Sequence, residues 1–245
     1  MKKPALGALL ATSLLVPGAY AGDLSDCTTV AACNQQGTAA YKAKNYDVAI
    51  GHFENQIDFA ERAEDEKAQL LAFNNLALAH LKKGEPLRAK AWLEEAAEID
   101  PADKATLFNR GEVDKALAKS PARPPIAGVY NSYIGGGQWN FIELEAKGKD
   151  TYKMTLLALR LGNAWREWGP AGIGELEADL KVEGDKATFN EKFEYADEAC
   201  KIEFNFVAPD EMEVEQWTPD MSCGFGNAVA ATGYYYRVEP GSSPE

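Results

Sequence analysis

The segment 221–237, MSCGFGNAVAATGYYYR, is the stretch whose residue types most suggest chemistry, because a cysteine stands beside a Gly-Phe-Gly run. A dinucleotide-binding loop needs a third glycine after Gly224 and Gly226, and that position holds Val229. A helix should then follow to hold phosphate, and no helical pattern does. A redox centre would need a CxxC pair, which the sequence lacks. The segment therefore predicts structure: a turn, then a closing strand at 229–237.

Candidate catalytic groups are scarce elsewhere. The two histidines, His52 and His80, lie in the helix-rich half, and we expect both to be structural or on the surface. The paired acids at 197–198 and 210–211 fall at predicted turns, where solvated carboxylates are usual. No loop has the alternating ligands of an EF-hand, and the absence of CxxC disfavours zinc. We therefore predict no catalytic residue, no metal and no cofactor; an enzyme is the third hypothesis.

A second unusual stretch, RLGNAWREWGPAGIG at 160–174, suggests binding. It holds Trp165, Arg166 and Trp168 on a predicted loop, and these residue types dominate binding hot spots. The alternative is a lid in which the two tryptophans plug one end of a barrel.

The first 21 residues have the pattern of a signal peptide. A basic start at Lys2 and Lys3 precedes an apolar run rich in small residues, and AYA stands before Gly22 as a cleavage site. The apolar run is too short to span a bilayer, and no later segment reaches that length. We expect an exported, soluble mature chain in a bacterial periplasm, with secretion as the alternative.

Export would place the four cysteines where disulfide bonds can form. An even number in an oxidising compartment favours two disulfides. Four cysteines allow three pairings, and sequence distance favours Cys27–Cys33 and Cys200–Cys223. Residues six apart do not share a helix face, so the first pair requires a turn.

The charge balance limits the partners. The net charge is −13, and loss of Lys2 and Lys3 with the signal peptide would make it more negative by two. This argues against nucleic acid and anionic membranes and is compatible with a basic protein partner. A strongly acidic surface also serves solubility alone.

The hydrophobic period changes near Ser120, which divides the chain into two predicted domains. Residues 23–120 have helical spacing, whereas residues 126–239 form short alternating runs broken by turn residues. The linker KSPARPP, with three prolines, cannot continue a helix. Residues 240–245 form a loose tail.

The helical half contains a repeat. In AFNNLALAHLKKGEPLRAKAWLEEAAEIDP (72–101), two helices flank a Gly-Glu-Pro turn, and a proline ends the unit. An earlier copy is GTAAYKAKNYDVAIGHFENQI (37–57), and LFNRG starts a third, with Asn109 34 residues after Asn75. These units resemble tetratricopeptide repeats over about residues 33–118.

That resemblance implies antiparallel helical hairpins that recognise another protein in a concave groove, with a packing module or spacer as the alternative. Candidate groove residues are Tyr41, Asn75 and Asn109. Since about three repeats are needed for a continuous core, two and a half should lean on the second domain, dimerise, or depend on Cys27–Cys33.

The C-terminal half predicts eight strands in consecutive hairpins, which favours an antiparallel up-and-down β-barrel because closure removes exposed edges. A β-sandwich is the alternative. The predicted strands are 127–133, 138–145, 151–160, 174–182, 186–194, 199–207, 211–217 and 229–237.

The barrel resembles small lipocalin-like barrels of exported bacterial proteins, including periplasmic lysozyme inhibitors. Such barrels either fill their interior or hold one small ligand. Bulky candidates for the interior favour filling: Trp139, Phe141, Leu156, Phe189, Phe204, Phe206, Val214 and Tyr235.

Taken together, the fold class is α+β, and the leading hypothesis is a non-enzymatic periplasmic binding protein. Its repeats would bind a protein while the barrel engages a target, for example as an inhibitor or immunity protein for a basic cell-wall hydrolase. The alternative is a lipocalin-like carrier of a small apolar ligand. The sequence does not define the oligomeric state.

Overall fold

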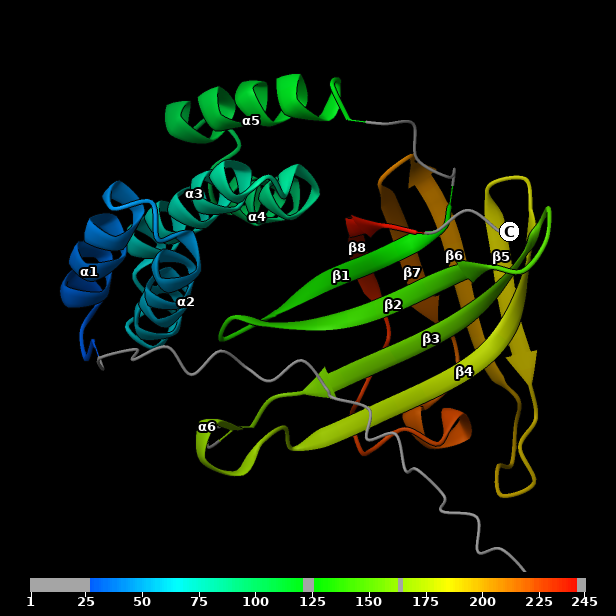
Figure 1. Ribbon diagram of the computed structural model, residues 1–245. Helices are drawn as coiled ribbons and strands as arrows, with labels where there is room; N and C mark the ends of the chain where they lie inside the picture. The colour runs from blue at the N-terminus through cyan, green and yellow to red at the C-terminus, as the bar shows by residue number, and fades with distance from the viewer. Residues whose placement is uncertain (1–26, 121–125, 163–164, 242–245) are drawn as a thin grey trace, which may run out of the picture.

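The computed structural model describes residues 27–120, 126–162 and 165–241. Helices α1–α5 form one side of the molecule and a closed barrel of eight antiparallel strands forms the other (Figure 1). The predicted α+β class with an up-and-down barrel is therefore confirmed. The predicted signal peptide, most of the proline linker and the end of the tail lie outside the described residues.

The helical layer consists of two antiparallel hairpins and one further helix. Asp65 begins the second hairpin by accepting the Ala68 N–H, and Gly84, with φ +90°, ends its first helix. Pro86 then starts the next helix at a position where proline is favourable. The helices are α1 (Val30–Lys42), α2 (Tyr46–Arg62), α3 (Glu66–Lys83), α4 (Pro86–Ile99) and α5 (Lys104–Leu117).

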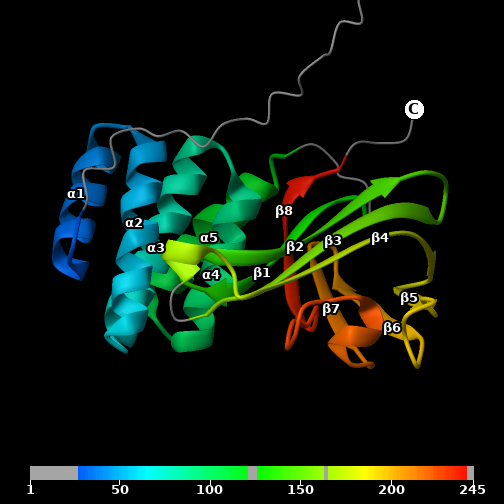
Figure 2. The ribbon, with the colours of Figure 1, turned by 90° about the horizontal axis from the view of Figure 1, so that it is seen from below.

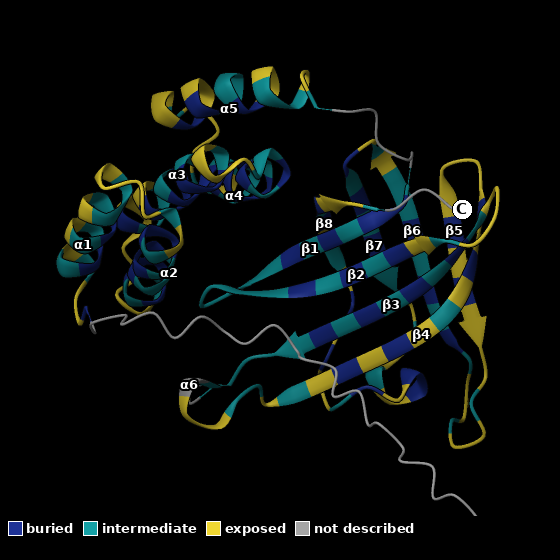
Figure 3. Ribbon diagram, viewed as in Figure 1, coloured by how far each residue is buried: buried dark blue, intermediate teal, exposed yellow. Residues whose placement is uncertain are grey.

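The barrel follows the chain order, each strand pairing with the next and β8 closing onto β1. Buried and solvent-facing residues alternate along the strands, as Figure 3 shows for β3 and β4. The strands are β1 (Gly128–Gly135), β2 (Gln138–Ala146), β3 (Thr151–Arg160), β4 (Gly172–Glu183), β5 (Lys186–Glu191), β6 (Cys200–Ala208), β7 (Glu211–Gln216) and β8 (Gly233–Pro240).

The last strand begins four residues later than predicted. Residues 229–232 lie outside β8, because Ala228 has φ +56° and the chain turns there, with the Val229 N–H bonded to the Gly226 carbonyl. Val229 and Ala231 are instead buried against the barrel core. The apolar residues that suggested a longer strand therefore pack as part of a loop.

The barrel interior is filled with side chains. Leu156, Phe189, Phe204, Val214 and Tyr235 all lie in its core, as predicted, and Phe206 packs against them. The largest fully buried side chains of the barrel include Tyr130, Ile142, Leu144 and Met154.

Two of the predicted interior residues were assigned to the wrong face. On β2 the buried positions are Asn140, Ile142 and Leu144, so Trp139 and Phe141 point outward. The hydrophobic pattern of β2 is ambiguous because both of its faces carry large apolar side chains. Trp139 is covered from outside by the helices, packing against their core.

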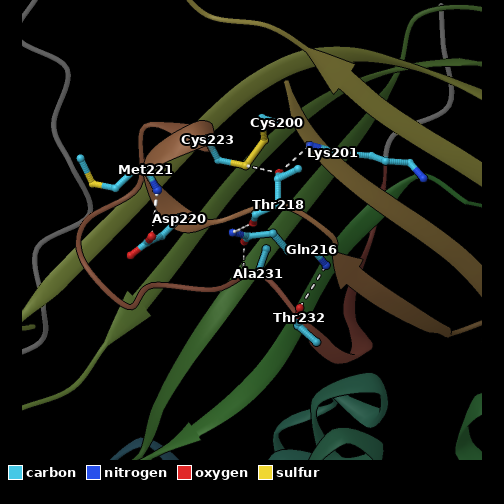
Figure 4. Close-up of a disulfide and its surroundings, with 9 residues drawn as sticks. All are labelled: Cys200, Lys201, Gln216, Thr218, Asp220, Met221, Cys223, Ala231 and Thr232. Atoms are coloured by element: carbon cyan, nitrogen blue, oxygen red, sulfur yellow. Dashed lines mark hydrogen bonds between the residues drawn. A yellow bond between two sulfur atoms is a disulfide. The ribbon is translucent and has the colours of Figure 1, made fainter. Parts of the chain in front are cut away.

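Both predicted disulfides are present, Cys27–Cys33 and Cys200–Cys223. The second joins the start of β6 to the 3₁₀ helix η1 (Asp220–Cys223) before β8 (Figure 4). Thr218 beside it accepts the Lys201 N–H at 2.9 Å. The Cys223 stretch is thus a clasp at one end of the barrel, as its sequence predicted.

The helices pack against the barrel directly. Helix α4 lies along β8, and the view in Figure 2 shows the helical layer beside the side of the barrel that β1 and β8 form. Ion pairs link Arg88 to Glu239 and Lys90 to Glu211 across the contact. None of the helices in the described part of the chain is long and apolar enough to cross a membrane.

Candidate functional site

A small apolar pocket lies in the helical layer, lined by residues of α1, α2 and α3. Its volume is about 240 Å³. It contains two of the three groove residues that the sequence suggested, Tyr41 and Asn75, although they are 34 residues apart along the chain. The lining residues are Thr38, Tyr41, Lys42, Phe53, Asn75 and Leu78.

The walls of this helical pocket are held in place by contacts between neighbouring helices. Tyr41 packs edge-on against Tyr46, with ring centroids 5.6 Å apart. Burial raises the pKa of Tyr41, and the electrostatic interaction with Tyr46 raises it further. The Asn75 side chain donates to Asn34 Oδ1 at 3.1 Å, which ties α3 to α1. The pocket can therefore take an apolar side chain, with the Asn75 amide as a polar group in its lining.

The third predicted groove residue, Asn109, does not line this pocket. It is buried, and its side chain donates to Asn74 Oδ1 at 2.8 Å. Asn74 in turn donates to Thr106 Oγ1 at 2.9 Å. Asn109 therefore belongs to a buried polar contact that joins α5 to α3, a role that its 34-residue spacing from Asn75 did not reveal.

The predicted tryptophan loop forms the short helix α6 (Trp165–Trp168). Trp165 packs on the β1–β2 hairpin, where a Cβ on Gly136 would come within 2.7 Å of its ring. Gly136 also has φ +59°, so glycine suits this position on both counts. Trp168 is 84% exposed and available to a partner, whereas the Arg166 side chain lies outside the described residues.

A second pocket, of about 450 Å³, lies on β2, β3 and β4. Its outward side chains combine the apolar Phe141 and Leu157 with the carboxylates Glu175 and Glu177. Lys153 lies 3.5 Å from Glu177 and neutralises part of this charge. An apolar floor edged with carboxylates suits a basic side chain. The sequence did not reveal this pocket, because Phe141 was assigned to the barrel interior.

The histidines are both buried in the helical layer. His80 Nδ1 lies 2.8 Å from Glu85 Oε2, which links the end of α3 to the following turn. Burial lowers the pKa of both His52 and His80, the Glu85 contact partly opposing this for His80. Among the described residues, no three His, Cys, Asp or Glu side chains gather in a way that could hold a metal ion.

An acidic and aromatic cluster lies where the helices meet the barrel. Glu61 of α2 accepts the Tyr133 hydroxyl and the Gly136 N–H, both at 2.6 Å. Burial raises the pKa of Glu54 to about 7, against the opposing effect of Arg88. The pKa of Glu95 is also raised to about 7, by burial and by the neighbouring acids Glu98, Glu94 and Glu61.

These shifted carboxyls predict a pH dependence of folding. A carboxyl whose pKa rises from 4.5 to about 7 on folding destabilises the native state progressively between those pH values and constantly above them. We expect Glu95→Gln to raise the free energy of unfolding by about 2 kcal/mol at pH 8 and to leave it unchanged at pH 4. Urea unfolding at both pH values measures this.

Glu194→Gln is the matched control, since Glu194 is exposed in the loop between β5 and β6, is not one of the acids that raise the pKa of Glu95, and should have little effect. An equal gain from both variants at pH 8 would mean that net charge, and not the partly buried position of Glu95, is responsible.

Comparison with known proteins found no matching family model, curated protein or solved structure. The fold defines the chain as a protein of helical hairpins packed on an eight-stranded antiparallel barrel. Its function therefore has to be inferred from its own surfaces.

Proposed function

We propose that this is an exported, non-enzymatic binding protein of the periplasm whose tetratricopeptide-like helices recognise a segment of another protein. The single observation that carries the proposal is the convergence of Tyr41 and Asn75 on one apolar pocket with Phe53 and Leu78. A concave, mostly apolar site with a few polar groups is the usual form of a binding pocket.

The packing of the helices supports the same function. The barrel is contacted through Glu61 of α2 and Trp92 of α4, whereas the helical pocket is lined by α1, α2 and α3. The barrel thus gives the short helical array the support that two and a half repeats lack by themselves. The two disulfides and the signal-like first 21 residues favour the oxidising periplasm.

The test is a measured affinity. A partner recovered from periplasmic extract with the wild-type protein is purified, and its binding is measured by calorimetry. We expect Leu78→Glu to weaken binding at least tenfold, because it places a charge in the apolar pocket. Glu66→Gln, an exposed change at the start of the same helix, should bind like the wild type. Equal affinities for all three proteins would refute the pocket as the binding site.

The barrel offers a second surface, for a basic target such as a cell-wall hydrolase. Trp168 is exposed, and the pocket edged by Glu175 and Glu177 is suited to lysine or arginine. If the barrel is the inhibitory surface, Trp168→Ala or Glu175→Gln should weaken binding to a basic hydrolase, whereas Leu78→Glu should not.

The alternative of a small-ligand carrier is less well supported. The side chains of Tyr130, Phe204 and Tyr235 occupy the barrel interior and are at most 1% exposed. A carrier of this architecture needs that space for its ligand.

A further inference from the structure

Another pocket lies in the helical layer, between the end of α3 and the end of α5. Its volume is about 460 Å³. Its charged lining residues are Glu112, Lys115 and Lys119, and Lys115 pairs with Glu112 at 2.6 Å. The remaining lining residues are Leu81, Gly84, Pro86, Ala116 and Ser120. We call it the α5 pocket, to distinguish it from the helical pocket described above.

The two pockets lie on either side of α3, towards its C-terminal end. Along α1 and α3, the contact of Asn34 with Asn75 is followed, towards both C-termini, by most of the lining of the helical pocket. Along α3 and α5, the buried contact of Asn74 with Thr106 is followed in the same way by the lining of the α5 pocket. Helices α1, α3 and α5 therefore run in the same direction, with their C-terminal ends side by side.

Lysines surround both pockets. Lys42 lines the helical pocket, whereas Lys115 and Lys119 line the α5 pocket. The hydrogen bond and charge of Lys115 lower the pKa of Glu112, and the charges of Lys82 on α3 and of Lys119 lower it further. Lys82 therefore lies in the same group, on the helix between the two pockets. We call these four lysines the lysine edge.

Lysine near the end of a helix also stabilises the helix dipole without any ligand. Lys83 shows this simpler arrangement, because its ammonium group lies 2.9 Å from each of two carboxylates. Lys42, Lys82 and Lys119 differ from it. They are exposed, and across residues 27–120, 126–162 and 165–241 no carboxylate lies within ion-pair distance of them. Their positive charges are therefore free to attract a ligand.

The charge of this surface is opposite in sign to that of the whole chain. The chain carries a net charge of −13, whereas the charged lining residues of the two pockets are three lysines and one glutamate. That glutamate, Glu112, is already paired with Lys115. A ligand that enters both pockets therefore meets apolar walls together with an excess of positive charge.

We propose that the protein segment recognised by α1, α3 and α5 is acidic, with apolar side chains that enter the two pockets and carboxylates that pair with the lysine edge. The inference rests on the proposed function and names the chemistry of its ligand. The net charge of the chain favours a basic partner, and that preference belongs to the barrel pocket edged by Glu175 and Glu177. The helices and the barrel thus select partner surfaces of opposite charge.

Synthetic peptides of about twelve residues are the probes for this inference. One set combines leucine and phenylalanine with aspartate and glutamate, a second combines the same apolar residues with lysine and arginine, and a third keeps the acids but replaces the apolar residues by serine. Fluorescence anisotropy measures their binding to the purified protein. We expect the acidic apolar set to bind with dissociation constants of roughly 10–100 μM, and the other two sets to bind at least about tenfold more weakly.

Charge reversal at the lysine edge tests the site itself. Lys82→Glu/Lys119→Glu should raise the dissociation constant of an acidic apolar peptide by about tenfold, because each change removes an attraction and adds a repulsion. Lys67→Glu/Lys149→Glu is the matched control, since it alters net charge equally at two other exposed lysines, and it should bind like the wild type. Lys67 lies near the start of α3, about 22 Å along the helix from Lys82.

Four results would overturn the inference: no binding of the acidic apolar set up to about 300 μM, a preference for the basic set, equal binding of the acidic apolar and acidic serine sets, or an unchanged affinity in Lys82→Glu/Lys119→Glu. The proposed function fails separately. If Leu78→Glu weakens binding of the partner recovered from periplasmic extract but Lys82→Glu/Lys119→Glu does not, the helical pocket remains the binding site and only the acidic ligand is rejected.

Discussion

Replacement of Arg237 by leucine is expected to lower the free energy of unfolding by about 3–5 kcal/mol. Arg237 is the largest fully buried side chain of the described residues and is only 1% exposed. Its Nε lies 3.4 Å from Asp210 Oδ1, and its Nη2 donates to the Pro209 carbonyl at 2.5 Å. The guanidinium also lies over the Tyr130 ring, 5.2 Å from its centroid. Leucine would leave the buried Asp210 carboxylate without this cation.

The effect should depend on the stranded charge. In Arg237→Leu/Asp210→Asn the remaining group is neutral, so the double variant should be more stable than the single variant. Guanidinium unfolding followed by circular dichroism measures all the proteins. A single variant that costs less than about 1 kcal/mol, or a double variant that is less stable than the single variant, would show that the pair does not secure β8 to the turn between β6 and β7.

Trp139→Ala is expected to cost about 3 kcal/mol and to uncouple the helices from the barrel. Trp139 points outward from β2 and packs edge-on against Trp92 of α4, with centroids 4.6 Å apart. Tyr133 completes the contact at 5.0 Å from Trp139. Alanine removes the larger of the two barrel side chains in this aromatic contact and leaves Tyr133 of β1, without disturbing the barrel interior, so the helices should lose support first.

Thermal unfolding followed at 222 nm, where helices dominate the circular dichroism, should therefore show an early transition separate from that of the barrel. Phe141→Ala is the matched control, because Phe141 also points outward on β2, two residues further along. There it lines the pocket on β2, β3 and β4 and not the contact with the helices. It should leave a single transition. A single unshifted transition in Trp139→Ala would mean that other contacts hold the two parts together.

Local sequence patterns predicted the elements well, for a physical reason in each case. Alternation with a period of two defined strands such as β4 because one face of a barrel wall is buried and the other is not. The pairing of Cys200 with Cys223 followed from their separation in sequence, and it was confirmed. The prolines near 121–125 marked the change from helices to strands, because proline cannot continue a helix.

The same patterns did not reveal which faces meet. On β2, Trp139 and Phe141 alternate with Asn140 and Ile142, so hydrophobicity by itself favours the aromatic face as the interior. The structure reverses this, since α4 covers Trp139 from outside and Asn140 is accommodated inside through the Leu159 N–H that it accepts. Apolar character shows that a side chain is covered, but not by what.

The sequence by itself determined the helical hairpins, the order and alternation of the strands, and both disulfides, because these depend on residues close in the chain or on the requirement to bury one face. Only the tertiary structure decided that Tyr41 and Asn75 share a pocket while Asn109 is buried. It also decided that Trp165 is packed while Trp168 is exposed, and that Leu107 and Phe108 of α5 face solvent. These depend on which surfaces distant segments present to one another. Spacing along the chain determines which residues share a helix face, whereas packing across the whole molecule determines what that face contacts.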